Sequence, residues 1–270
     1  MQMQERLYDC GSGTIHYWVT SGRLERKTMV FLPGLTAEHH LFDRQIEAFQ
    51  DEYQILTWDA PGHGLSRPFS LDFSLMDKAA WLHEILERER IQHPVLIGQS
   101  MGGYVSQCFM ERYRGEAEGF ISIDSAPIQR AYMPRIEIAA LKRTETMYRM
   151  YPWERLRIDA ARGCSETALG RAYMEKVIGQ YTRDEYCRLA GHGFRILAEA
   201  IEADLPYRID CPAMLICGCK DRAGFTKRYN RQWADETKLP VHWIEGAGHN
   251  SNMDCPDEVN DLIRAFVRKI

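Results

Sequence analysis

The sequence predicts an α/β fold, with a mostly parallel sheet of eight strands that helices cover on both faces. Two observations support this. Short apolar runs alternate with amphipathic segments along most of the 270 residues. The runs are apolar on both faces, which is typical of parallel strands buried between helices. A third observation is that the strand pattern stops for about eighty residues and then resumes, which indicates an inserted helical cap.

The expected strands follow from continuous or alternating apolar runs that end at glycine, proline or aspartate. They fall at residues 5–10, 14–20, 28–34, 53–59, 94–98, 119–124, 212–218 and 240–245. The first two form a hairpin around Gly-Ser-Gly. Amphipathic spacing predicts helices at residues 38–53, 74–90, 101–117, 226–238 and 256–270.

Between residues 128 and 206 only helical patterns remain, so we expect residues 1–127 and 207–270 to form the core domain and 128–206 to form the cap. The cap segment holds 13 Lys/Arg against 11 Asp/Glu and gives no strong charge signal. An insertion at the carboxyl edge of a parallel sheet lies where such sheets bind ligands, so the cap is a candidate lid.

Composition excludes several classes of protein. The net charge of −4 gives no reason to expect nucleic acid or an anionic membrane as a partner. No apolar stretch approaches the length of a membrane span, and the N-terminus has no leader pattern. We therefore expect a cytoplasmic protein whose eight cysteines are free thiols.

The glycine-rich loops do not fit a nucleotide site. Arg67 and Ser251 stand where a dinucleotide-binding loop needs its third glycine, and the chain has no Gly-Lys-Ser/Thr triplet. Cys217 and Cys219 lack a second pair for zinc. We expect no cofactor, no metal, and a small molecule as the binding partner.

The first candidate catalytic residue is Ser100, a possible nucleophile in the stretch VLIGQSMGGYV. A strand that turns sharply into a helix strains the serine backbone and exposes its hydroxyl above the sheet. Gly98 and Gly102 leave room for that turn, and Gly103 lets the helix approach the sheet. The alternative is an ordinary tight turn in which Ser100 caps the helix.

A serine nucleophile needs a base. Among nine histidines, His249 is the best candidate, because it follows the last strand and so lies at the same sheet edge as Ser100. Four other histidines in loops or in the cap are candidates to line a pocket: His39, His40, His63 and His192.

The base needs a carboxylate to orient it. Asp221 ends the strand before the one that leads to His249, so their loops should be neighbours. Asp124 ends the strand after Ser100 and is the alternative acid. We favour Asp221, and both keep the chain order serine, acid, histidine.

Acyl transfer also needs two N–H donors for the developing oxyanion. The expected donors are the backbone amides of Met101, directly after the serine, and of Leu35, after the strand that ends in Pro-Gly. Backbone donors place no demand on the side chain.

Taken together, these loops resemble those of the α/β-hydrolase-fold family over nearly the whole chain except the cap. The matching motifs are Pro33-Gly34-Leu35, DAPGHGLS at 59–66, GQSMGG at 98–103, GCKD ending at Asp221 and GAGH ending at His249. Gln99 and Pro33 stand where the family often has histidine. Both positions are variable spacers.

The resemblance implies that the cap shapes a pocket. Candidate pocket residues are Gln99, Phe42, Tyr148 and Trp153, although the cap aromatics would also serve simply to hold its helices together. The cap arginines are either a solvated face or a site for an acidic substrate.

The resemblance further implies a serine hydrolase that cleaves a small ester, thioester or lactone. Two alternatives remain. Related enzymes with the same three residues cleave C–C bonds of keto-acids or eliminate pyruvate, and a ligand sensor could retain all three. Epoxide hydrolysis and dehalogenation are disfavoured, because the related enzymes use Asp where Ser100 stands.

Overall fold

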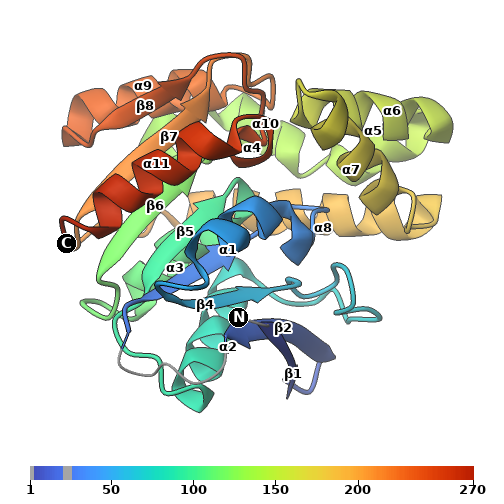
Figure 1. Cartoon of the computed structure of the whole chain (residues 1–270). Helices are drawn as coiled ribbons and strands as arrows, with labels where there is room; N and C mark the ends of the chain where they lie inside the picture. Colours follow the sequence, from blue (N-terminus) through green and yellow to red (C-terminus); the bar gives the residue numbers. More distant parts are fainter. Residues whose placement is uncertain (1–2, 21–25) are drawn as a thin grey trace.

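The computed structural model of the chain describes residues 3–20 and 26–270, so residues 1, 2 and 21–25 of the expected core segment 1–127 lie outside the described residues. The described chain forms one eight-stranded sheet in the order β1-β2-β4-β3-β5-β6-β7-β8 (Figure 1). The strands are β1 Met3–Asp9, β2 Thr14–Thr20, β3 Thr28–Leu32, β4 Gln54–Trp58, β5 Val95–Gln99, β6 Gly119–Ile123, β7 Ala213–Gly218 and β8 Val241–Ile244. The predicted fold class is confirmed.

Pairing within the sheet explains where the loops meet. The strands from β3 to β8 are all parallel, whereas β1 and β2 form an antiparallel hairpin that joins the sheet beside β4. Because parallel strands end at the same edge, the loops after β3, β5, β6, β7 and β8 lie together. The candidate site is built from these loops.

Each face of the sheet carries its own core. Alternate residues of β3 divide between them: Val30 and Leu32 belong to one buried cluster, Met29 and Phe31 to the other. The first face is covered by α2 Leu75–Arg88, α3 Met101–Arg112 and α9 Thr226–Thr237, and the second by α1 Asp43–Phe49 and α11 Pro256–Val267. Coverage on both sides accounts for strands that are apolar on both faces.

The segment between β6 and β7 is helical. It contains the 3-10 turn η2 Arg130–Tyr132 and the helices α4 Arg135–Leu141, α5 Thr144–Met150, α6 Trp153–Cys164, α7 Ala168–Ile178 and α8 Arg183–Ala203. Figure 1 shows α5, α6 and α7 standing apart from the sheet, with α8 running beneath them. We call residues 130–203 the helical insertion.

Two elements differ from expectation. The helix expected at 38–53 is a 3-10 turn, η1 His39–Phe42, followed by the shorter α1. A four-residue helix not expected from the sequence, α10 Ser251–Asp254, begins two residues after His249. It is too short to show a periodic pattern.

In the described part of the chain, we find no helix with the length and apolar character that a membrane crossing requires.

Candidate active site

Ser100 lies in a strained turn between β5 and α3. Its backbone has φ 50° and ψ −115°, outside the regions that non-glycine residues usually adopt. A Cβ at Gly102 would lie 1.9 Å from the carbonyl oxygen of Leu32, and one at Gly98 would lie 2.4 Å from Gly102. The expectation that this turn needs glycine on both sides of the serine is confirmed.

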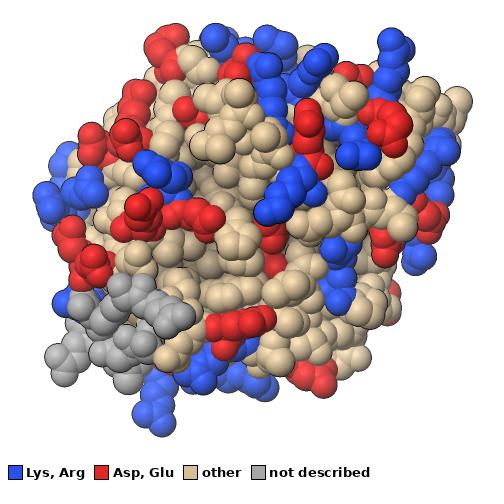
Figure 2. Space-filling model, turned by 45° about the vertical axis from the view of Figure 1, so that its right-hand side comes forward, with Lys and Arg blue, Asp and Glu red and all other residues tan. Residues whose placement is uncertain are grey.

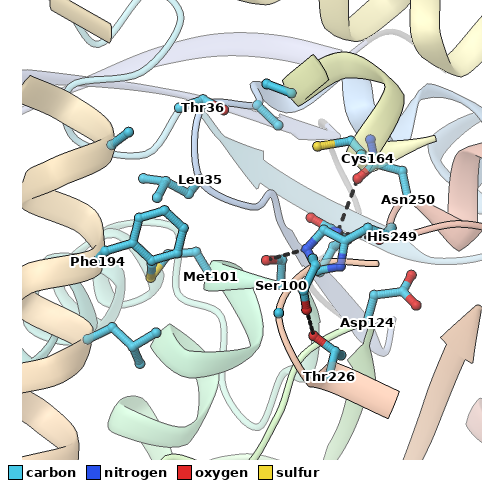
Figure 3. A pocket seen from close by; sticks show the side chains of 18 of the residues that line it. Leu35, Thr36, Ser100, Met101, Asp124, Cys164, Phe194, Thr226, His249 and Asn250 are labelled. Carbon is cyan, nitrogen blue, oxygen red and sulfur yellow. Dashed lines mark hydrogen bonds between the residues drawn. The ribbon is translucent and has the colours of Figure 1, made fainter. Parts of the chain in front are cut away.

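Three residues from three loops form a chain of hydrogen bonds at the sheet edge. Ser100 Oγ lies 2.8 Å from His249 Nε2, and His249 Nδ1 lies 2.9 Å from Asp221 Oδ2. The other oxygen of Asp221 accepts the backbone N–H of Ala223 at 2.7 Å, which fixes the carboxylate. Figure 3 shows the His249 ring pointing toward Ser100.

The surroundings of His249 favour its protonated form. Burial alone lowers the pKa of the ring, but the charge and hydrogen bond of Asp221, helped by the charge of Asp124, outweigh burial and raise it overall. A base with a raised pKa accepts the serine proton more readily.

Asp124, the alternative acid, has other partners. One carboxylate oxygen accepts the backbone N–H of Gly218, and the second accepts both the backbone N–H and the hydroxyl of Ser251. Burial, together with the charge of Asp221, raises the pKa of Asp124 to about 7. Asp124 thus ties the end of β7 to the residues after His249, whereas Asp221 contacts the ring.

Gln99 lines the cavity as expected, and it also holds the loop of the base. Its side-chain amide donates to the backbone oxygen of His249 at 2.8 Å and to Asn250 Oδ1 at 3.2 Å. A Cβ at Gly34 would lie 2.2 Å from Gln99 Oε1, so this side chain packs against the Pro-Gly turn.

Leu35 and Met101 both line the cavity beside Ser100 (Figure 3). The N–H of Ser100 itself donates to the oxygen of Ile123 at 2.8 Å and is therefore occupied. Met101 follows directly, at the first position of α3, where a helix N–H has no partner within the helix. Their role as oxyanion donors stays a prediction.

A cavity of about 400 Å³ opens above Ser100, a size typical of small-molecule sites. Apolar and aromatic side chains from the core and from the insertion make up most of its lining. They include Leu35, Met101, Tyr104, Met133, Leu141, Tyr148, Met174, Tyr186, Phe194, Leu197, Phe225 and Tyr229. Figure 3 shows Phe194 of α8 directed toward Met101 and Leu35.

Among the predicted pocket residues, Gln99 and Tyr148 line the cavity, but Phe42 and Trp153 lie elsewhere. Phe42 is fully buried beneath the sheet edge, with its ring 5.0 Å from that of Phe31. Trp153 packs on Tyr186 within the small core of the insertion. The structure does not support a pocket role for either.

The other candidate histidines do not line this cavity either. His39 stacks on Trp18 at 3.5 Å, and His40 pairs with Asp43. His63 is fully buried, and His192 contacts Arg195 at 2.8 Å.

Sequence reasoning missed Thr36, Tyr104, Cys164, Tyr186 and Phe194, which line the cavity. Tyr104 had a usable signal, because it lies one helical turn after Ser100 and so on the same side of α3. The others come from the insertion or from a loop bend, where the sequence has no periodic relation to Ser100.

Charge around the cavity is sparse. Arg222 is the one lysine or arginine among the cavity-lining residues that the structure describes, and it pairs with Glu166. In the insertion, Arg149 pairs with Asp184 and Arg157 with Glu154 near the surface. Figure 2 shows Lys and Arg side chains interspersed with Asp and Glu around an uncharged area, on the face of the molecule that it draws. These pairs favour the solvated-face interpretation of Arg149 and Arg157.

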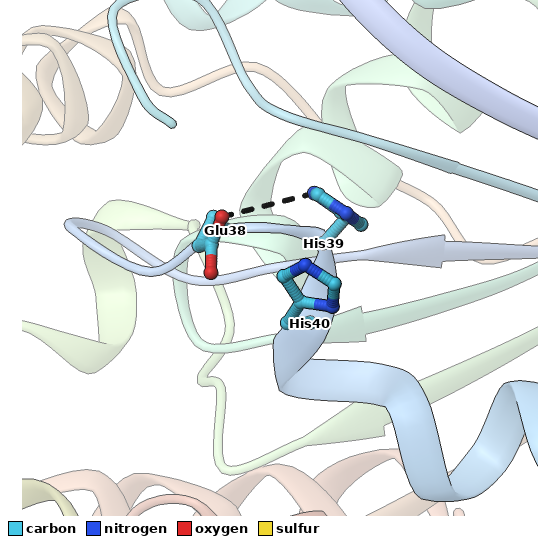
Figure 4. Close-up of side chains that lie close together, drawn as sticks. All are labelled: Glu38, His39 and His40. Atoms are coloured by element: carbon cyan, nitrogen blue, oxygen red, sulfur yellow. Dashed lines mark ion pairs between the residues drawn. The ribbon is translucent and has the colours of Figure 1, made fainter. Parts of the chain in front are cut away.

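Within residues 3–20 and 26–270, two groups of side chains bring possible metal ligands together. Glu38, His39 and His40 lie side by side (Figure 4), but His39 Nδ1 already lies 2.8 Å from Asp59. Asp124, Cys217 and Asp221 also cluster. Both carboxylates there already accept N–H or O–H groups, and burial raises the pKa of the Cys217 thiol.

Comparison with known proteins identifies the family of the chain. The profile described as "Alpha/beta hydrolase family" matches residues 29–262. The chain belongs to the alpha/beta hydrolase family. The resemblance inferred from the motifs is confirmed, and so is the prediction that the chain is an enzyme.

A curated relative is named (E)-2-((N-methylformamido)methylene)succinate hydrolase, from Acinetobacter baylyi. It is 24% identical over 261 residues, which cover 94% of each chain. Among solved structures, the Cif epoxide hydrolase of Acinetobacter nosocomialis has a TM-score of 0.79 at 13% identity, covering 98% of this chain and 88% of that one. The enol-lactonase of Burkholderia xenovorans LB400 has a TM-score of 0.74 at 20% identity, covering 97% of this chain and 100% of that one. The two structures show a shared fold.

Proposed function

We propose that the chain is a serine hydrolase that cleaves a small carboxylic ester, thioester or lactone through an acyl-enzyme on Ser100. The observation that carries the proposal is the unbroken contact from Ser100 through His249 to Asp221 at the floor of an apolar cavity. A hydroxyl, an imidazole and a carboxylate in this order constitute an activated nucleophile.

The reaction follows from these contacts. His249 Nε2 takes the hydroxyl proton as Ser100 Oγ attacks the substrate carbonyl. The backbone amides of Leu35 and Met101 stabilise the oxyanion. The imidazolium then gives its proton to the leaving alcohol, while Asp221 stabilises its charge and fixes its orientation. A water, activated by His249 in the same way, cleaves the acyl-enzyme.

The cavity narrows the class of substrate. Its side chains are mainly aliphatic or aromatic. Among its described lining residues, Arg222 is the one with a positively charged Lys or Arg side chain, and that side chain is 70% exposed and paired with Glu166. An uncharged, apolar acyl or alcohol group gains free energy by leaving water here. A carboxylate would lose its hydration without a buried cation to compensate.

The cost of burying a carboxylate in this cavity bears on the second candidate function, cleavage or elimination of a keto-acid. A keto-acid carries a carboxylate, and the curated relative named above has a succinate in its name. Arg222 at the cavity is the observation that favours this candidate. A ligand sensor would leave the same contacts intact and turn over very slowly.

A substrate panel tests the proposal. p-Nitrophenyl acetate, butyrate and hexanoate, a thioester and a lactone are compared with a dienoic keto-acid at equal concentration. We expect turnover of the esters, with kcat/KM rising from acetate to butyrate as apolar surface is buried. Turnover of the keto-acid alone would favour the second candidate, and binding without turnover would favour a sensor.

A further inference from the structure

A single carboxylate, that of Asp254, joins the helical insertion to the loop of His249. Oδ1 accepts the hydroxyls of Ser165 and Thr167 at 2.5 and 2.7 Å and the backbone N–H of Thr167 at 3.0 Å. Oδ2 accepts the backbone N–H groups of Glu166 and Gly248, both at 2.9 Å. Asp254 is the last residue of α10, and its partners at 165–167 connect α6 to α7.

The residues on both sides of His249 are hydrogen-bonded to the insertion or to Asp254. Gly248 donates to Asp254, and the backbone N–H of Asn250 donates to the backbone oxygen of Cys164 at 2.7 Å. Gly248 is also closely packed, since a Cβ there would lie 3.3 Å from Asp254 Oδ2 and 3.4 Å from the oxygen of Cys164. The backbone at His249 is therefore held from both sides by residues 164–167, directly or through Asp254.

A further link reaches the loop of the acid. Glu166 pairs with Arg222, the residue after Asp221, at 3.4 Å. The loop of the acid, through Glu166, and the loop of the base thus both contact the segment 164–167 of the insertion.

We infer that Asp254 is a positioning residue, which fixes His249 relative to Ser100 by seating residues 164–167 of the insertion against the base loop. The inference rests on the proposed function and deepens it. The insertion then does more than close over the substrate, because its correct seating is a condition for a productive His249.

The chemistry of the site requires a carboxylate. All five groups that face Asp254 are donors, three on Oδ1 and two on Oδ2, and the side chain is buried. An asparagine offers one acceptor oxygen and places an NH₂ group against donors on its other side. With its oxygen on the Oδ1 side, the NH₂ group faces the backbone N–H groups of Glu166 and Gly248. With its oxygen on the Oδ2 side, the NH₂ group faces the backbone N–H of Thr167, and the two hydroxyls must turn to accept its hydrogens.

The first test compares Asp254→Asn with Asp261→Asn, a matched loss of charge at an exposed position on α11, using p-nitrophenyl acetate. We expect kcat of Asp254→Asn to fall by at least tenfold with KM within threefold, because Asp254 is not among the residues that line the cavity. Asp261→Asn should stay within twofold of the wild type for both constants. A folded Asp254→Asn protein with wild-type kcat, or a change in KM alone, would overturn the inference.

A second test does not depend on catalysis or on the folding of Asp254→Asn. The Ser165→Ala/Thr167→Ala double variant removes two donors to Asp254 and leaves the base loop unaltered. Amide hydrogen exchange should become at least tenfold faster at Gly248, with no change at Ser100, whose N–H lies in the sheet. Unchanged exchange at Gly248 would overturn the link. If the wild type hydrolyses esters normally and exchange at Gly248 is unchanged in the double variant, this inference alone is contradicted. If the wild type does not hydrolyse esters, the proposed function is contradicted.

Discussion

The carboxylate of Asp221 lies 2.9 Å from Nδ1 of His249, on the side of the ring opposite Ser100. This contact predicts that Asp221→Asn lowers kcat for p-nitrophenyl butyrate by about 10⁴-fold, because an amide cannot stabilise the imidazolium or hold the correct tautomer. Steady-state kinetics measures the effect. A loss below tenfold would remove Asp221 from the role of orienting acid.

Asp124→Asn is the informative comparison. Asp124 accepts hydrogen bonds from Gly218 and Ser251 and so supports the loop around His249. Losing part of that support costs about 1–3 kcal/mol, so kcat should fall by no more than about a hundredfold. If Asp124→Asn lowers kcat more than Asp221→Asn does, Asp124 and not Asp221 is the orienting acid.

The pH profile follows from the pKa of His249, which Asp221 raises above the ordinary 6.5 despite burial. The base acts only when neutral, so kcat/KM should fall as the pH drops through this raised pKa, with the midpoint above pH 6.5. In Asp221→Asn the raising interaction is lost while burial still lowers the pKa, and the residual activity should extend to lower pH. A wild-type midpoint below 6, or an unmoved one in the variant, would contradict this assignment.

The turn at Ser100 predicts a stability effect. In Gly102→Ala the new methyl would lie 1.9 Å from the oxygen of Leu32, so β3 or α3 must shift. We expect a loss of about 3 kcal/mol in unfolding free energy, the upper end of the cost of overpacking. Gly163→Ala is the control, since a Cβ there meets no atom within 4 Å and alanine favours a helix. Equal urea midpoints for the two variants would show that the turn at Ser100 accommodates a methyl group at residue 102.

The cavity predicts a change in chain-length preference. Ala190 lies on α8 and lines the cavity. Ala190→Phe should fill space beside Phe194 and lower kcat/KM for p-nitrophenyl hexanoate by at least tenfold, with that for acetate within threefold. Equal losses for both esters would indicate a general disturbance of the site and place the acyl group elsewhere.

The sheet and the positions of its loops could be predicted from the sequence, because buried parallel strands leave continuous apolar runs and their carboxyl ends must meet. Ser100, Asp221 and His249 lie in the loops that follow β5, β7 and β8, so their proximity was predictable from the topology of the sheet. The family resemblance, in addition, suggested Gln99 and Tyr148 as pocket residues, and both line the cavity.

Other features leave no local pattern. Asp254 acts through partners about ninety residues earlier in the chain, and four of its five contacts are to residues 165–167. Phe42 was misplaced because its helix begins with a 3-10 turn, which directs the ring into the core. Which insertion side chains reach the cavity depends on how α4 to α8 pack together, and the sequence does not contain a period that reports it.

Covalent labelling tests most directly whether Ser100 is the nucleophile. A fluorophosphonate probe is incubated with the wild type and with Ser100→Ala, and the labelled peptide is identified by mass spectrometry. We expect one label on Ser100 in the wild type and none on the variant, with both proteins folded. Equal labelling of the two proteins, or a folded wild type that resists the probe while cleaving esters, would contradict it.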